Sequence, residues 1–154
     1  MRIERIEIDV LKKYYMKANS WIDFKIEIRE RLKTFALKIL ELSEKFPKTP
    51  KANIINYQLT KSGTSVYANY RAALRGRSKA EFFSKLSISV EEADESDMWL
   101  DMCITSGIFK DDFVKNLHKE SLEIVKILSN LRKKTSSPFH LKILKEFNQF
   151  LLHL

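Results

Sequence analysis

The sequence is poor in the residues that form turns and cross-links. Its 154 residues include three glycines, three prolines and a single cysteine, Cys103. So few turn residues argue against a many-stranded β protein. One cysteine excludes an intramolecular disulfide and a cysteine-rich zinc site. The sequence also lacks a run of eighteen apolar residues, and charges interrupt its first five residues, where a signal peptide would need an apolar stretch. We therefore expect a cytoplasmic protein with no membrane partner.

The residues that are abundant fit a helical globular protein. Hydrophobic residues make up 44% and charged residues 31% of a chain of single-domain length. In four stretches apolar residues recur at steps of three and four, which is the spacing along one face of an α-helix. The four stripes are Ile28, Leu32, Phe35, Ile39, Leu42 and Phe46; Ile55, Leu59, Ser62, Val66, Asn69 and Ala73; Phe83, Leu86, Val90, Ala93, Asp97, Leu100 and Ile104; and Val114, Leu117, Ser121, Ile124, Leu128 and Leu131.

Helix-ending and helix-starting residues separate these stripes. Pro47 ends the first one, and Thr49-Pro50 is a favourable start for the second. Gly76 ends the second, and Ser78 with Glu81 forms the pattern of a capping box for the third. Four amphipathic helices with short links predict an all-α fold, an antiparallel up-down-up-down four-helix bundle.

We expect one domain over residues 1–154, with the bundle at about 20–135 and short extensions at 1–19 and 136–154. The first extension fits either a helix, with apolar residues at 3, 6 and 10, or a short strand, with apolar residues at 6, 8 and 10. In the second, Leu141, Leu144, Phe147 and Leu151 have the spacing of a short amphipathic helix. Both extensions are more apolar than a solvated tail, so we expect them to pack on the bundle or on another subunit.

The charge of the chain points to an acidic partner. The formal net charge is +8, and residues 61–85 hold six basic residues and one acidic residue. Such a field favours nucleic acid. The candidate phosphate-binding residues are Lys61, Arg75, Arg77, Lys79 and Lys85. Tyr67 and Tyr70 are candidates for stacking on unpaired bases.

The same basic residues have a structural interpretation. Residues 86–109 hold six acidic and no basic residues. For Arg71 and Arg75 we favour pairing with Glu91, Glu92 or Glu95 on the neighbouring helix over binding of phosphate. Asp97 falls on an apolar stripe, so we expect it to pair with a basic residue across the bundle or at a subunit contact.

The sequence gives no sign of catalysis, a metal or a cofactor. Its three histidines, His118, His140 and His153, do not follow a glutamate by three residues, as a di-iron bundle site would require. No serine, histidine and acid spacing indicates a nucleophile, and no glycine-rich phosphate loop is present. We expect His118 at the surface, Cys103 in the core, and Trp99 in the core or an interface.

Several motifs together resemble a known family. They are Lys61-Ser62-Gly63-Thr64-Ser65-Val66-Tyr67-Ala68-Asn69-Tyr70-Arg71, then Ser78-Lys79-Ala80-Glu81-Phe82, then Glu91-Glu92-Ala93-Asp94-Glu95 with Trp99-Leu100. This order is similar to that of the bacterial four-helix-bundle family, also called the 23S ribosomal RNA intervening-sequence protein family. The resemblance covers about residues 25–135. Lys61 stands where the family usually has arginine, and Tyr67 where it usually has glycine.

The resemblance implies a four-helix bundle that assembles as a ring, most often a homopentamer, and no established enzymatic activity. It assigns structural or interface roles to the motif residues Asn69, Arg71, Glu92, Glu95 and Trp99. For Asp97 we expect such a role from its place on the apolar stripe. A related protein, the accessory variability determinant of diversity-generating retroelements, is a basic pentamer that binds a reverse transcriptase and nucleic acid. Our hypothesis is a non-catalytic homo-oligomer that binds RNA, DNA or a nucleic-acid-processing protein such as a reverse transcriptase. The alternative is a protein-interaction scaffold without a nucleic-acid role.

Overall fold

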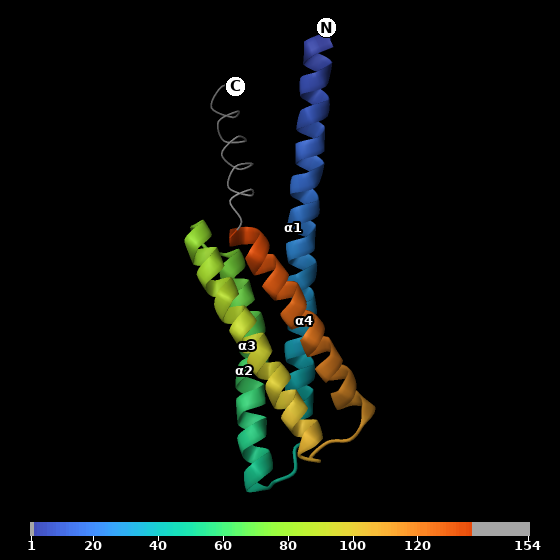
Figure 1. Cartoon of the computed structure of the whole chain (residues 1–154), viewed down its shortest axis with the longest axis vertical. Coiled ribbons are helices and arrows are strands. Elements are labelled where there is room, and N and C mark those ends of the chain that lie inside the picture. The colour runs from blue at the N-terminus through green and yellow to red at the C-terminus, as the bar shows by residue number, and fades with distance from the viewer. Residues whose placement is uncertain (1, 137–154) are drawn as a thin grey trace.

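Four antiparallel helices form the part of the chain that the structure, a computed structural model, describes. This part is residues 2–136, with the backbone alone for residues 2–15, 17 and 18. The helices are α1 (Arg2–Ser43), α2 (Pro50–Leu74), α3 (Lys79–Thr105) and α4 (Asp112–Ser136). Successive helices run in opposite directions, with short links (Figure 1). Within residues 2–136 there is no strand, and the predicted all-α four-helix bundle is confirmed.

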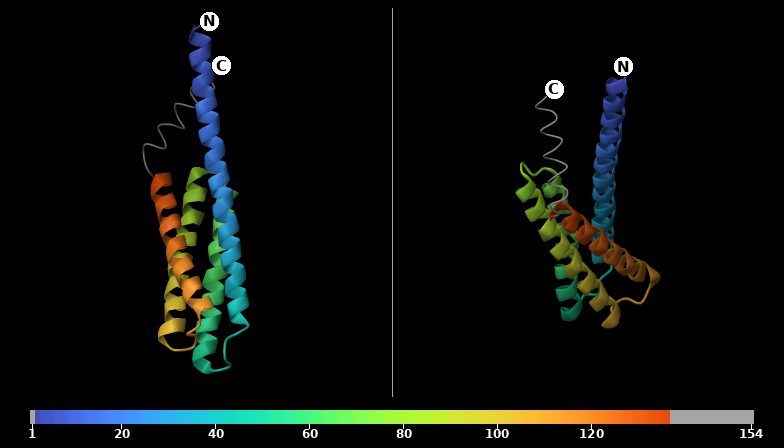
Figure 2. Two further views of the ribbon diagram at one scale, coloured as in Figure 1. Left: turned by 90° about the vertical axis from the view of Figure 1, so that its right-hand side faces the viewer. Right: turned by 45° about the horizontal axis from the view of Figure 1, so that its top comes forward.

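Helix α1 is longer than the sequence analysis predicted. It begins at Arg2 and runs unbroken for 42 residues, so the expected boundary near residue 20 is absent. Residues 2–19 are helical, and the strand alternative is wrong. Because the other helices are shorter, the first half of α1 projects past them at one end of the bundle (Figures 1 and 2). The amphipathic segment predicted from Leu141 to Leu151 lies outside the described residues.

The hydrogen bonds at the first turns of α2 and α3 confirm the predicted helix starts. The hydroxyl of Thr49 accepts from the Ala52 N–H at 3.2 Å, and Pro50 is the first residue of α2. The hydroxyl of Ser78 accepts from the Glu81 N–H at 3.0 Å. The Glu81 carboxylate reaches back one residue beyond the cap and accepts from the Arg77 N–H at 2.9 Å. These bonds satisfy backbone donors that a helix start leaves free.

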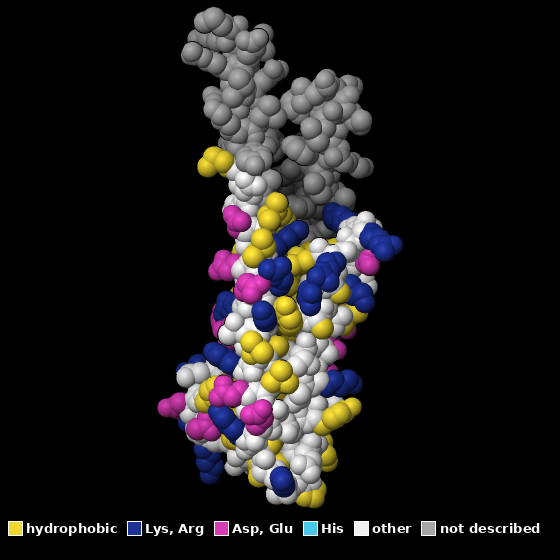
Figure 3. All heavy atoms as spheres, turned by 180° about the vertical axis from the view of Figure 1, so that it is seen from behind, with side chains coloured by type: hydrophobic (Ala, Val, Ile, Leu, Met, Phe, Trp, Pro, Cys, Tyr) yellow, Lys and Arg dark blue, Asp and Glu magenta, His cyan; other side chains and the backbone are white. Residues whose placement is uncertain are grey.

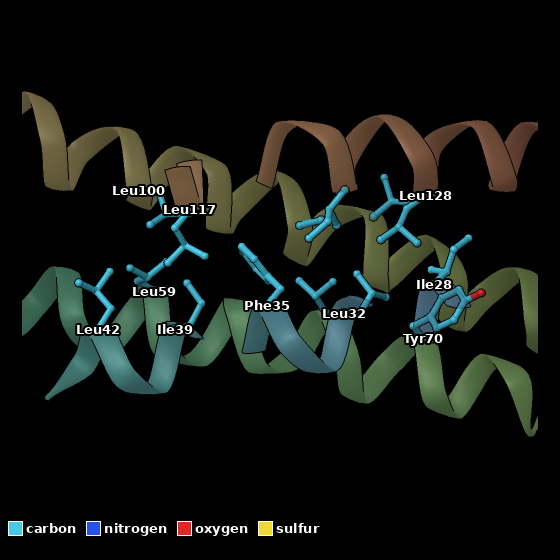
Figure 4. Packing of buried hydrophobic residues seen from close by; sticks show 14 of the residues in the cluster. Ile28, Leu32, Phe35, Ile39, Leu42, Leu59, Tyr70, Leu100, Leu117 and Leu128 are labelled. Atoms are coloured by element: carbon cyan, nitrogen blue, oxygen red, sulfur yellow. The ribbon is translucent and has the colours of Figure 1, made fainter. Parts of the chain in front are cut away.

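The four apolar stripes form one core (Figure 4). The stripe of α4 is buried along its whole length, and the stripe of α1 is buried from Ile28 to Leu42. Two positions differ from the prediction. Tyr70 is fully buried in place of its neighbour Asn69, and Phe82 packs on the core while Phe83 is 37% exposed. Both shifts move the buried stripe by one residue, which the 3.6-residue helical period permits.

Small side chains let α2 and α3 pack closely. The hydroxyl of Ser89 donates to the Val66 carbonyl at 2.8 Å, and the hydroxyls of Ser96 and Ser62 lie 3.0 Å apart. These contacts fix the antiparallel register of the two helices. By contrast, α4 crosses α1 at an angle and contacts it over a short stretch (Figure 2).

An ion pair joins α1 to α4 where they meet. The Arg31 guanidinium donates to both carboxylate oxygens of Glu120, with distances of 2.6 and 2.9 Å. The hydrogen bond to Glu120 is the main reason why the pKa of Arg31 is raised.

Among residues 2–136, no helix is both long and apolar enough to cross a membrane.

Candidate nucleic-acid interface

A basic hollow lies on the C-terminal half of α2, where the chain turns into α3. Its volume is about 650 Å³. We call it the arginine hollow, and it is lined by Tyr67, Ala68, Arg71, Ala72, Arg75, Arg77 and Glu81. Steps of four residues place Tyr67, Arg71 and Arg75 on one face of α2. Arg77 comes from the link to α3. The local sequence therefore brings three guanidinium groups and one aromatic ring to a single surface.

The three arginines of the hollow are exposed and form no ion pair with a residue between 2 and 136. The favoured pairing of Arg71 and Arg75 with Glu91, Glu92 or Glu95 is thus not found in this part of the chain. The one carboxylate in the lining, that of Glu81, bonds the Arg77 backbone N–H. The guanidinium donors remain available to a phosphate.

The register of α2 and α3 explains why the expected pairs do not form. Because Ser96 lies beside Ser62 and Ser89 beside Val66, the acidic stretch of α3 faces the middle of α2. Arg71 and Arg75 lie at the other end of α2, opposite the start of α3, where Lys79 and Lys85 outnumber Glu81.

The acidic residues of α3 interact with other groups. Glu95 accepts a hydrogen bond from the Trp99 indole N–H at 3.1 Å. Burial, together with repulsion from Glu95 and Glu91, raises the pKa of Glu92, while the charge of Lys61 opposes this rise. Asn69 is also engaged locally, since its amide donates to the Ser65 carbonyl at 3.0 Å. Glu95 and Asn69 are therefore bonded within their own helices.

The two candidate stacking residues differ in their surroundings. Tyr67 is half-buried and lines the arginine hollow. Tyr70 is fully buried, and its hydroxyl donates to the Lys25 carbonyl of α1 at 3.2 Å. Burial raises the pKa of Tyr70 far above its ordinary value. Tyr70 is therefore a core residue, and the prediction that it stacks on a base is wrong.

The structure separates the predicted phosphate-binding residues. Arg75 and Arg77 meet in the arginine hollow, and Lys79 is exposed next to it and lines a neighbouring groove with Arg77. Lys61 lies about 20 Å away along α2, at the helical rise of 1.5 Å per residue. It borders a different hollow, beside Tyr57. Lys85 is half-buried on α3. The predicted basic site is therefore smaller than the sequence suggested, because Lys61 lies far from Arg75 and Arg77.

The carboxylate of Asp97, for which a basic partner was expected, contacts a serine and a histidine on α4. Ser121 Oγ lies 2.6 Å from its carboxylate and 2.7 Å from the His118 carbonyl. His118 Nε2 lies 3.2 Å from the same carboxylate, so His118 is half-buried rather than a surface residue. Neither contact of the Ser121 hydroxyl is with the imidazole of His118, whereas an activated serine nucleophile would bond that ring. Among the described residues, no three His, Cys, Asp or Glu side chains gather as metal ligands would.

The fold and the hollow define a class of protein: an antiparallel four-helix bundle with a basic surface where its second and third helices meet. The model of one family, described as 23S rRNA-intervening sequence protein, matches residues 25–130. The chain belongs to this family, and the resemblance predicted from its motifs is confirmed.

One solved structure of this fold is a protein of unknown function from the S23 ribosomal protein family of Bacteroides thetaiotaomicron VPI-5482. It is 29% identical to this chain, with a TM-score of 0.65. The match covers 71% of this chain and 97% of the other one. The curated proteins contain no significant match.

Proposed function

We propose that this protein is a non-catalytic nucleic-acid-binding bundle, and that the arginine hollow holds the phosphate backbone. The observation that carries the proposal is the set of three exposed guanidinium groups, Arg71, Arg75 and Arg77, without a carboxylate partner among residues 2–136. Unpaired arginines close together repel one another, and an anion removes that repulsion. Arginine binds phosphate oxygens with two parallel N–H donors.

Phosphate contacts give affinity without choice of sequence. The net charge of +8 adds a long-range attraction for any nucleic acid. Tyr67 contributes the one aromatic ring of the hollow, which favours a single strand whose unpaired base stacks beside the bound phosphates. Lys79, exposed next to Arg77, extends the basic surface.

We further propose that the protein acts as a homo-oligomer, with the homopentamer as the expected form. Large hydrophobic side chains are exposed on both α1 and α2: Leu37 is 57% exposed, Ile54 61% and Tyr57 68%. Exposed apolar side chains of this kind mark contact surfaces. A ring would repeat the arginine hollow, and repeated weak contacts to one strand increase the overall affinity. The mass in solution, from light scattering at micromolar concentration, tests this part, and a monomer would contradict it.

Binding of a fluorescently labelled 30-nucleotide RNA, followed by anisotropy, tests nucleic-acid recognition. The variant Arg71→Gln/Arg75→Gln/Arg77→Gln removes three charges from the hollow. A control variant, Lys38→Gln/Lys48→Gln/Lys119→Gln, removes three exposed charges elsewhere, so both variants have the same net charge. We expect the hollow variant to lose at least tenfold in affinity and the control to lose about two- to threefold, because only the first removes direct phosphate contacts. Equal losses, or no binding by the native protein at low salt, would favour the scaffold function.

A further inference from the structure

A second groove lies at the end of the bundle from which α1 projects. We call it the end groove, and its volume is about 610 Å³. Its walls come from all four helices, and its lining includes Trp21, Ile22, Ile26, Phe82 and Thr135. Figure 3 shows hydrophobic side chains beside Lys and Arg side chains over this end of the bundle.

The groove exposes side chains that a folded protein normally covers. Ile22 is 52% exposed and Ile26 is 42% exposed, only six and two residues before the buried Ile28. Further along, Met16 is 72% exposed. Among residues 2–136, no helix accompanies the projecting half of α1 (Figures 1 and 2). A single helix in water is marginally stable unless another segment packs on it.

The chain itself supplies a segment of suitable position and pattern. Helix α4 ends at Ser136, and Thr135 in its last turn is a wall of the end groove. The next residues, 137–154, therefore start at the edge of the groove. Their apolar residues Leu141, Leu144, Phe147 and Leu151 follow a helical spacing, and Lys142, Lys145 and Gln149 fall on the opposite face of such a helix.

The lengths also agree. Eighteen residues in a helix span about 27 Å, and the part of α1 before Trp21 spans about 30 Å. Both segments lie outside residues 25–130, to which the family model is confined, and the relative from Bacteroides is matched over 97% of its length by only 71% of this chain. Two additions to the family fold thus begin at the same end of the bundle.

From these observations we infer that residues 137–154 pack as an amphipathic helix along the projecting half of their own α1, with the first apolar residues of the segment against Ile22, Ile26 and Phe82 in the end groove. A second copy is the less favourable occupant, because the segment of the same chain is joined directly to the wall of the groove and so has a high effective concentration there. This inference is independent of the nucleic-acid proposal.

Disulfide trapping in the full chain tests the inference. The only cysteine, Cys103, is buried and is first replaced by serine. Ile22→Cys is then combined with Leu141→Cys, and Asn19→Cys with Leu141→Cys or Leu144→Cys, because a segment that leaves Thr135 antiparallel to α1 passes these positions first. The purified protein is oxidised under mild conditions. We expect at least one pair to close within the monomer, which migrates faster on a non-reducing gel. Lys142→Cys and Lys145→Cys, on the polar face at the same level, are the matched controls and should remain reduced.

The other outcomes contradict the inference. Disulfides between chains would assign the groove to a second copy, and no disulfide, or equal trapping of the two faces, would show that the segment does not dock. A second measurement does not depend on new cysteines. In a Trp99→Phe background, Trp21 is the only tryptophan. Ending the chain after Ser136 should then shift its fluorescence to longer wavelength and lower the melting temperature by several degrees, whereas an unchanged spectrum would oppose docking.

Discussion

A Cβ atom on Gly63 of α2 would lie 2.8 Å from Cγ1 of Ile39 on α1. Ile39 is fully buried and β-branched, so its side chain has little freedom to move away. We expect Gly63→Ala to destabilise the protein by about 1–2 kcal/mol, because overpacking outweighs the gain in helix propensity. Urea denaturation measures this change. Gly63→Ala combined with Ile39→Val should recover part of the loss, and a more stable single variant would show that the helices tolerate separation.

The Arg31–Glu120 pair is the second testable contact. Its bidentate geometry joins α1 and α4 across a side of the bundle with few other contacts. Because both side chains are about one third exposed, Glu120→Gln should cost only about 0.5–1 kcal/mol, and less at high salt. The matched control is Glu123→Gln, which removes an exposed pair within α4. No measurable change is expected there, and equal effects of the two variants would contradict a bridging role.

Asp97 provides a third test, since it bonds Ser121 across α3 and α4. Asp97→Ala leaves His118 and Ser121 without their shared partner, and we expect a loss of about 1–3 kcal/mol. Asp94→Ala, on the exposed face of the same helix, is the control and should change stability little. If both alanine variants unfold at the same denaturant concentration, the contact contributes nothing.

The single thiol gives a prediction about pH. Burial raises the pKa of Cys103 to about 12, so the folded protein keeps a neutral and shielded thiol at pH 8. Ellman's reagent should react with it only after denaturation. The unfolded chain releases this proton at a lower pH than the folded one, so the contribution of Cys103 to stability declines from about pH 8.5 upward. Rapid reaction of the native protein would show that this part of the core opens.

The helical pattern of the sequence was sufficient to predict the bundle, because the steps of three and four directly reflect which face is buried. It was less reliable at single positions. Asn69 and Tyr70 are neighbours at the edge of one stripe, and only the contact of the Tyr70 hydroxyl with the Lys25 carbonyl shows which of them enters the core. The unbroken α1 was missed because Trp21, Phe24 and Ile26 disturb the regular stripe at the point where the helix leaves the bundle.

The basic site could be predicted only in part. Arg75 and Arg77 are neighbours in sequence and remain so in space, whereas the position of Lys61 depends on the length of α2. Whether Arg71 could pair with a glutamate of α3 depended on the register between α2 and α3. That register is fixed by buried serine contacts such as Ser89 with Val66, which helical spacing alone does not reveal.

The most direct test of the account is the salt dependence of RNA binding. We expect the logarithm of the affinity of the native protein to fall linearly with the logarithm of salt concentration, because bound phosphates release their counterions. In Arg71→Gln/Arg75→Gln/Arg77→Gln the slope should be smaller by about two to three for each hollow occupied, and in the control variant it should be nearly unchanged. The same slope in all three proteins would contradict the arginine hollow as the site where nucleic acid binds.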